Sequence, residues 1–140
     1  MLKLTPDEMM TYLDDVFPQV SGEFGIEALE DMFIRTRLNV TERHLRPGGT
    51  VSGPSIFALA DVSVYMIVLG MIGREALAVT TSCSIDFMRK PAANTDLIAE
   101  CRLLKLGRVL AVGDVLIYSD GSDKPVARAS LTYSIPPKAA

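Results

Sequence analysis

The chain has 140 residues, 49% of them hydrophobic and 22% charged, which is the balance of an ordinary soluble globular protein and not of a disordered one. A formal net charge of −3 argues against general nucleic-acid binding, because that function needs a basic surface to neutralise phosphates. The two cysteines, Cys83 and Cys101, are too few for a disulfide scaffold and lie in apolar-rich runs. We therefore expect buried free thiols in a cytoplasmic protein, with a single domain over residues 1–140.

The N-terminal segment predicts a helix and not a targeting sequence, because residues 1–8 contain no apolar run and no cleavage site. Thr5 fits the N-cap, Pro6 the first helical position, and Glu8 completes a capping box. Apolar residues then recur at helical spacing until Pro18, so one face of the helix docks on an apolar surface. We assign residues 1–20 to this helix and residues 21–137 to the core of the fold.

Two extended segments follow, at about residues 25–30 and 31–40. The second alternates, with Arg35 and Arg37 on one side and Ile34 and Leu38 on the other, as in a half-buried strand. Residues 41–53 carry three glycines and the only histidine, His44, and read as a loop. We expect His44 to be exposed and to have no catalytic role.

The segment from Pro54 to Leu69 predicts a helix that ends at Gly70. Its apolar residues cover every face, so the helix must be buried all round. The apolar run 56–72 is shorter than the ~20 residues that cross a bilayer, and Asp61 interrupts it, so we expect no membrane span. The simplest surroundings are a curled sheet and a partner subunit.

Four candidate strands supply that sheet, at about residues 77–88, 96–106, 108–118 and 125–134, with turn signals between them. Their short connections indicate an antiparallel meander following the helix. The predicted fold class is therefore α+β, with a strongly bent antiparallel sheet wrapped around one hydrophobic helix.

Asp61 is the most informative residue, because it lies two turns into a helix of Ile, Leu, Val and Met. An aspartate is almost never fully buried without a partner, and an unpaired carboxylate in apolar surroundings is costly. One interpretation is a structural carboxylate that bonds a neighbouring loop. The other is a base or nucleophile at the edge of an apolar cleft, where burial tunes its pKa.

The loop before the helix favours the second interpretation. Residues 48–53 (GGTVSG) lead into the helix N-terminus, where backbone N–H groups lack intrahelical partners and the helix dipole is positive. Such N–H groups stabilise a carbonyl oxygen that gains negative charge, and Gly53 allows a substrate to approach its backbone closely. A Walker-type phosphate loop is excluded, since no Gly-Lys-Ser/Thr follows.

The chain resembles the PaaI-like (phenylacetate-pathway) group of hotdog-fold acyl-CoA thioesterases over roughly residues 30–135. Residues 49–54 (GTVSGP) and 58–61 (ALAD) are similar to a signature that reads Asn-Pro-x-Gly-Thr-Val-His-Gly-Gly, followed by a helix with Leu-Ala-Asp. Residues 79–91 resemble the family's Thr-x-x-x-x-Phe-Leu-Arg-Pro strand, 106–111 its Gly-Arg hairpin, and 126–129 its closing strand. The resemblance implies a hotdog fold.

The resemblance also implies roles for individual residues. Asp61 corresponds to the carboxylate that attacks the thioester or activates water, and Gly53 to the glycine whose N–H polarises the thioester carbonyl. Thr80 or Thr81 corresponds to a hydroxyl, supplied by the partner subunit, that positions water. The expected contacts for the coenzyme A ester are Arg46, Ser52, Pro54, Tyr65, Arg89 and Lys90.

Three of these positions depart from the family pattern. Ser52 stands where the family has histidine, Arg46 where it has asparagine, and Pro54 where it has the second glycine of the motif. Pro54 has no N–H and removes one donor at the helix start. The expected function is hydrolysis of an acyl-CoA thioester. A catalytically silent acyl-CoA- or lipid-binding hotdog protein, and a small interaction domain, remain open as alternatives.

The expected assembly is a homodimer or homotetramer with active sites at the subunit interface, as the resemblance implies. Pairing of edge strands across a two-fold axis would also protect them from other partners. A zinc site is not expected, because one histidine and two cysteines share no ligand spacing. The reaction requires no metal or redox cofactor, since coenzyme A is part of the substrate. Tyr65, Met66 and the N-terminal helix are candidates for shaping a pocket for the acyl group; the alternative is that these apolar residues belong to the core.

Overall fold

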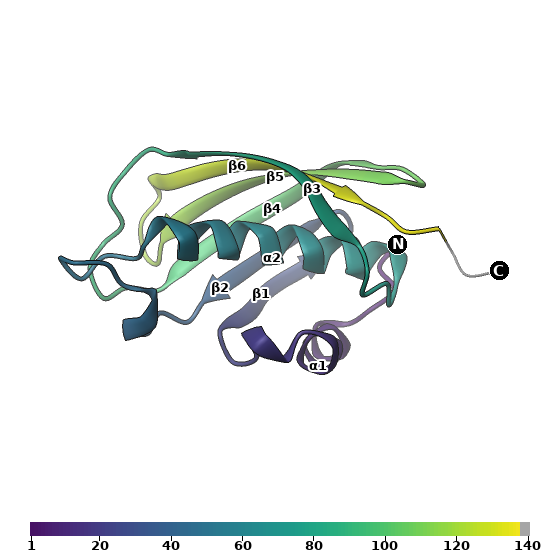
Figure 1. The fold of residues 1–140 in the computed structure, drawn as a ribbon, viewed down its shortest axis with the longest axis horizontal. Helices are drawn as coiled ribbons and strands as arrows, with labels where there is room; N and C mark the ends of the chain where they lie inside the picture. Colours follow the sequence, from purple (N-terminus) through teal and green to yellow (C-terminus); the bar gives the residue numbers. More distant parts are fainter. Residues whose placement is uncertain (138–140) are drawn as a thin grey trace.

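A computed structural model describes residues 1–137, which form a six-stranded antiparallel sheet curled around one long helix (Figure 1). The chain begins with helix α1 (Pro6–Val16) and a short 3-10 turn, and a second 3-10 turn precedes helix α2 (Gly53–Ile72). The strands are β1 (Phe24–Glu30), β2 (Phe33–Leu38), β3 (Val79–Phe87), β4 (Leu97–Leu106), β5 (Leu110–Ser119) and β6 (Pro125–Ser134). This architecture confirms the predicted α+β hotdog fold.

The strand order is β1-β2-β4-β5-β6-β3, which corrects the prediction of a simple meander after the helix. Strands β4, β5 and β6 do form a meander, but β3 pairs with β6 at the far edge of the sheet. The chain crosses the concave face as α2 and leaves it at that edge (Figure 1). As a result, β1 and β3 are the two edge strands.

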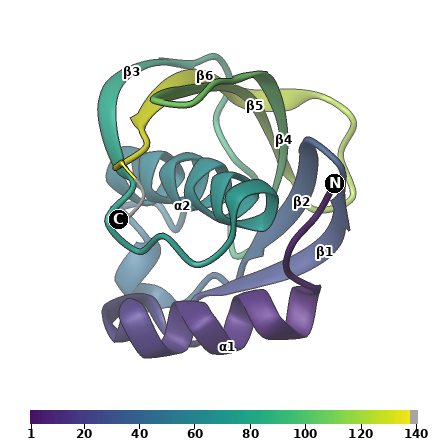
Figure 2. The same cartoon turned by 90° about the vertical axis from the view of Figure 1, so that its right-hand side faces the viewer.

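Helix α1 covers the side of α2 that the sheet leaves open (Figure 2). Its start has the predicted capping box, in which the Glu8 N–H donates to Thr5 Oγ1 at 3.1 Å and the Thr5 N–H donates to Glu8 Oε1 at 3.0 Å. Met9 and Leu13 on its inner face are buried in the core. The predicted amphipathic N-terminal helix is therefore confirmed.

Helix α2 is longer than predicted, because Gly70 does not end it. The helix continues to Ile72 and is capped by Gly73 at a φ of 98°. A Cβ at Gly70 would lie 3.4 to 3.6 Å from side chains of Leu2, Leu29 and Met9, which is ordinary van der Waals contact, so these side chains from other segments pack on the helix at this glycine. At 20 residues the helix is long and apolar enough to cross a membrane, but 72% of its most apolar 18-residue segment is buried inside the protein.

Candidate active site

The carboxylate of Asp61 lies between α2 and two strands at the β3 edge of the sheet. Its Oδ1 accepts a hydrogen bond from Thr80 Oγ1 at 2.5 Å and another from the Tyr133 hydroxyl at 2.8 Å. The same tyrosine hydroxyl lies 3.1 Å from the Asp61 carbonyl oxygen. Within residues 1–137, no cation pairs with this carboxylate and no donor bonds its Oδ2. Asp61 is thus a partly buried carboxylate with one oxygen held and the other available.

A β-bulge brings the two hydroxyls to the same oxygen. Thr80 faces Tyr133 directly in the β3–β6 ladder, and the register shifts between Thr80 and Ser82. Side chains alternate between the two faces of a regular strand, and Cys83 faces the core. In a regular strand, Thr81 would therefore also point to the helix. The extra residue of the bulge turns Thr80 inward instead, and Thr81 Oγ1 donates to the Thr132 carbonyl at 3.3 Å. The structure thus brings Thr80, and not Thr81, to Asp61.

This contact lies within one chain, because Thr80 of β3 reaches Asp61 on α2 of the same copy. The expectation that a partner subunit supplies a hydroxyl to the site stays a prediction.

The groups around Asp61 stay in their neutral forms. Burial, followed by the negative charge of Asp61, raises the pKa of the Tyr133 hydroxyl, so this group remains a hydrogen-bond donor. Burial and the same carboxylate raise the pKa of Cys83, which is half-buried and not fully buried as expected. Burial raises the pKa of Cys101 to about 12. Neither free thiol therefore has the character of an activated nucleophile.

The start of α2 presents one unused backbone donor. Ser52 caps the helix, and its Oγ accepts the Ser55 N–H at 3.4 Å and donates to Ser55 Oγ at 3.1 Å. Pro54 has no N–H, and the Ile56 N–H donates to the Ser52 carbonyl. Within residues 1–137 the Gly53 N–H has no partner. Cap and proline together leave Gly53 as the donor that this terminus offers to a ligand.

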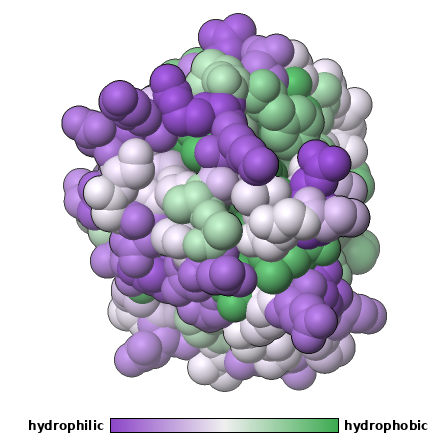
Figure 3. Space-filling model, turned by 90° about the vertical axis from the view of Figure 1, so that its left-hand side faces the viewer, coloured by the Kyte–Doolittle hydropathy of each residue, from purple (hydrophilic) through white to green (hydrophobic). Residues whose placement is uncertain are grey.

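A cleft of about 690 Å³ opens at this terminus. Figure 3 shows this end of the molecule, where hydrophilic side chains surround smaller apolar areas. Arg46 and Lys90 are exposed cations on the cleft, and Arg89 donates to the Pro125 carbonyl at 2.7 Å. The lining consists of Arg46, Pro47, Thr50, Val51, Gly53, Ile56, Phe87, Met88, Arg89, Lys90 and Pro91.

Gly53 and Asp61 are too far apart to act together within one chain. They are eight residues apart on the same helix, which is about 12 Å along its axis at 1.5 Å per residue. A donor and a base acting on one carbonyl group must each lie about 3 Å from it. In a single copy, the Gly53 N–H and the Asp61 carboxylate therefore lie at two separate places.

Two of the expected binding residues lie in the core. Met66 is fully buried, and Tyr65 is 6% exposed with its hydroxyl donated to the Ala76 carbonyl at 2.8 Å. Tyr65 packs against Tyr133 with ring centroids 6.1 Å apart. Tyr65 therefore supports the ring of Tyr133, which bonds Asp61, and Tyr65 does not line the cleft.

Two residues were misjudged or missed in the sequence. His44 is buried at 4% exposure, contrary to expectation, and its Nε2 bonds Glu23 Oε1 at 2.7 Å. Tyr133 was not considered, although the alternation of Ala129, Leu131 and Tyr133 in the last strand would have placed its side chain on the inner face.

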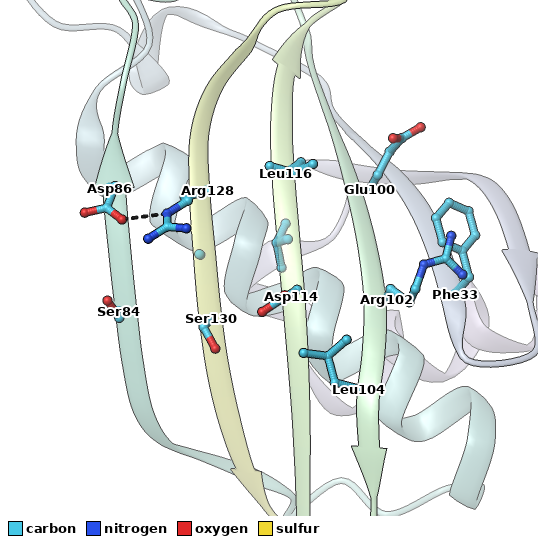
Figure 4. A pocket seen from close by; sticks show the side chains of 12 residues that line it. Phe33, Ser84, Asp86, Glu100, Arg102, Leu104, Asp114, Leu116, Arg128 and Ser130 are labelled. Atoms are coloured by element: carbon cyan, nitrogen blue, oxygen red, sulfur yellow. Dashed lines mark hydrogen bonds and ion pairs between the residues drawn. The ribbon is translucent and has the colours of Figure 1, made fainter.

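A second hollow, of about 440 Å³, lies on the outer face of the sheet (Figure 4). Charged side chains from several strands border it, among them the ion pair between Arg128 and Asp86 at 2.8 Å. The sheet separates this hollow from α2 (Figure 4), and neither Asp61 nor Gly53 lines it. It is a separate feature from the carboxylate site.

A model of the thioesterase superfamily matches residues 48–126, a segment that contains the α2 terminus, Asp61 and β3. The chain belongs to the thioesterase superfamily. It is 64% identical to a "putative thioesterase" from Silicibacter sp. TM1040, whose crystal structure superposes with a TM-score of 0.92 over 98% of this chain and 95% of that one.

Two further solved structures share the superfamily fold. A mutant of the phenylacetic acid degradation protein PaaI from Thermus thermophilus is 25% identical, with a TM-score of 0.71 over 85% of this chain and 99% of that one. A Streptococcus mutans protein, solved bound to acetyl CoA, is 23% identical, with a TM-score of 0.73 over 84% of this chain and 91% of that one. The resemblance to PaaI-like hotdog thioesterases is confirmed.

Proposed function

We propose that the protein hydrolyses an acyl-CoA thioester to a free acid and coenzyme A, with Asp61 as general base or nucleophile. The observation that carries the proposal is the state of the Asp61 carboxylate. It is held on one oxygen by two neutral hydroxyls and paired with no cation among residues 1–137, so its charge is not neutralised. A purely structural carboxylate would be expected to use both oxygens or to pair with a cation.

In the proposed reaction, Oδ2 of Asp61 takes a proton from water as the water oxygen attacks the thioester carbonyl carbon. The carbonyl oxygen gains negative charge and accepts the Gly53 N–H. The carbon–sulfur bond then breaks, the acid is released, and the coenzyme A thiolate receives the proton. In the nucleophilic alternative, Oδ2 attacks the carbonyl carbon itself, and the carbon–sulfur bond breaks to release the coenzyme A thiolate. Water then hydrolyses the resulting anhydride to the free acid and the Asp61 carboxyl group, whose proton passes to the thiolate.

The Gly53 N–H and the Asp61 carboxylate meet if two copies pair through β3. The Phe87 end of this edge strand lies beside Gly53, since a Cβ there would be 3.5 Å from the Phe87 ring. Its other end lies beside Asp61, at the Thr80 contact. Antiparallel pairing of two β3 edges places the Phe87 end of one copy against the Thr80 end of the other. We propose that Gly53 of one copy and Asp61 of its partner form each site.

The cations on the cleft support a phosphate-bearing substrate. Arg46 and Lys90 have no ion-pair partner among residues 1–137, so their charge is available to the coenzyme A phosphates. The S. mutans relative, which has the same fold, was solved with acetyl CoA. Both observations favour a coenzyme A ester over a simple ester.

The test is thiol release from a panel of acyl-CoA esters by wild type and Asp61→Asn. We expect turnover to fall about 10²- to 10⁴-fold in the variant, the typical contribution of a general base. Asp14→Asn, which removes an exposed carboxylate from α1, is the matched control and should keep wild-type turnover. Turnover that survives Asp61→Asn refutes the role assigned to this residue.

A second candidate, an acyl-CoA-binding protein without turnover, is favoured by Ser52. Its hydroxyl is engaged with Ser55 at the helix cap and has no acid–base function like that of an imidazole. Calorimetry with a thioether analogue of acyl-CoA separates the candidates. Tight binding without thiol release from the true ester would establish the silent binder, and neither binding nor release would favour an interaction domain.

A further inference from the structure

We propose that Tyr133 is a positioning residue, whose hydroxyl works with that of Thr80 to hold Oδ1 of Asp61 so that Oδ2 is the reacting oxygen. This inference rests on the proposed function and extends it to the last strand of the fold. Tyr133 itself contacts no reacting atom in this scheme and acts through Asp61.

The hydrogen-bond capacity of Oδ1 is filled by these two donors. A carboxylate oxygen has two lone-pair positions, and Thr80 and Tyr133 occupy them at 2.5 and 2.8 Å. A proton taken from water must therefore go to Oδ2. The two oxygens of one carboxylate are thereby made chemically distinct.

The Tyr133 hydroxyl donates its hydrogen bond to the Asp61 carboxylate and not to the backbone carbonyl. The hydroxyl has one proton and two acceptors within reach, Asp61 Oδ1 at 2.8 Å and the Asp61 carbonyl oxygen at 3.1 Å. The bond to the ionised group is charge-assisted, which makes it shorter and stronger. The hydroxyl therefore donates to Oδ1 and holds the Asp61 side chain.

The ring of Tyr133 is rigidly supported. It is 3% exposed and packs against Tyr65, with ring centroids 6.1 Å apart and planes at 34°. Tyr65 is held by its hydroxyl on the Ala76 carbonyl and by an edge contact from Phe17, 6.4 Å between centroids. A side chain fixed at ring and hydroxyl loses little entropy when it holds the carboxylate, which is the requirement for preorganisation.

Tyr133→Phe removes only the hydroxyl and tests the inference in the acyl-CoA assay. We expect kcat to fall about tenfold with KM changed by less than about twofold, because the interaction acts on the reacting geometry and not on substrate binding. In an Asp61→Asn background the same substitution should cause no further loss, since the oxygen that it positions no longer reacts.

Thr36→Val is the matched control. Thr36 is fully buried, and its hydroxyl bonds Ser63 of α2 at 2.6 Å, so this variant also removes a buried hydroxyl that contacts the helix. We expect it to keep wild-type kcat. Wild-type kcat in Tyr133→Phe, or an equal loss in Thr36→Val, overturns the inference.

A double-mutant cycle on stability separates this inference from the proposed function. Urea unfolding gives the free energy of unfolding of wild type, Tyr133→Phe, Asp61→Asn and the double variant. Because the two side chains share a hydrogen bond at 2.8 Å, we expect the double variant to lose less stability than the sum of the two single losses. If wild type hydrolyses no acyl-CoA, the proposed function fails and this cycle alone decides: additive losses overturn the inference, and non-additive losses support it.

Discussion

His44 and Asp61 are two titratable groups that the fold withdraws from solvent, and they are held in opposite ways. Nδ1 of His44 accepts the Thr41 N–H at 2.9 Å, so Nε2 carries the proton and donates it to Glu23 at 2.7 Å. Both ring nitrogens are therefore used by the protein. Asp61 uses one oxygen for two hydroxyls and keeps the other unbonded among the described residues.

Under the proposed function, the difference separates a structural polar group, His44, from a reactive one, Asp61. Burial alone does not separate them, because the histidine is the more deeply buried of the two. The unfilled hydrogen-bonding capacity does: His44 has none left, so it holds the loop that leads to α2, whereas Asp61 can still accept a proton. Substitutions at the two sites should therefore affect different properties of the protein.

The largest expected effect on stability follows removal of the histidine. His44→Leu leaves the Thr41 N–H without its acceptor and the Glu23 carboxylate with Arg43 as its remaining partner, and we expect it to lower the free energy of unfolding by about 2–3 kcal/mol. The kcat of the folded fraction should stay at the wild-type value. Urea unfolding measures the free energy of unfolding, and thiol release measures kcat. A loss of kcat with unchanged stability would contradict the structural role assigned to His44.

A smaller effect, on activity and not on stability, is expected for one of two neighbouring threonines. Thr80→Val removes a donor from Asp61 Oδ1, and kcat should fall about tenfold, or about 1.4 kcal/mol in activation free energy. Thr81→Val removes only a surface bond to the Thr132 carbonyl and should have wild-type kcat. Equal effects of the two substitutions would show that the bulge does not select Thr80.

The fold was predictable where the contacts that decide it are local. The start of α1 follows from Thr5 and Glu8, three residues apart, and the apolar residues on every face of α2 predict that the protein surrounds it, as its burial confirms. The end of α2 was mispredicted, because the packing of Leu2 and Leu29 on Gly70 brings together distant parts of the chain. The edge position of β3 likewise depends on pairing with β6, about 50 residues later.

The same limit applies to the site. Asp61 was predictable because a carboxylate within an apolar helix is unusual in its local sequence. Its partner Tyr133 is 72 residues away, and Thr80 was not distinguishable from Thr81 because a bulge leaves no mark on the alternation of polar residues. His44 was expected to be exposed because its partner Glu23 lies in a different segment, 21 residues earlier.

The smallest expected effect is the pH dependence of the Glu23–His44 contact. Burial raises the pKa of Glu23, but hydrogen bonds from His44 and Arg43 outweigh it and hold the pKa below the ordinary 4.5. The unfolded chain therefore binds the proton more readily, so the stabilisation is complete above about pH 4.5 and is lost as the pH falls through the lower, folded-state pKa. In urea unfolding, the free energy of unfolding of wild type should exceed that of Glu23→Gln by an amount that falls as the pH is lowered through this acidic range. A difference that stays constant with pH would mean that Glu23 stabilises the loop by packing and not by its charge.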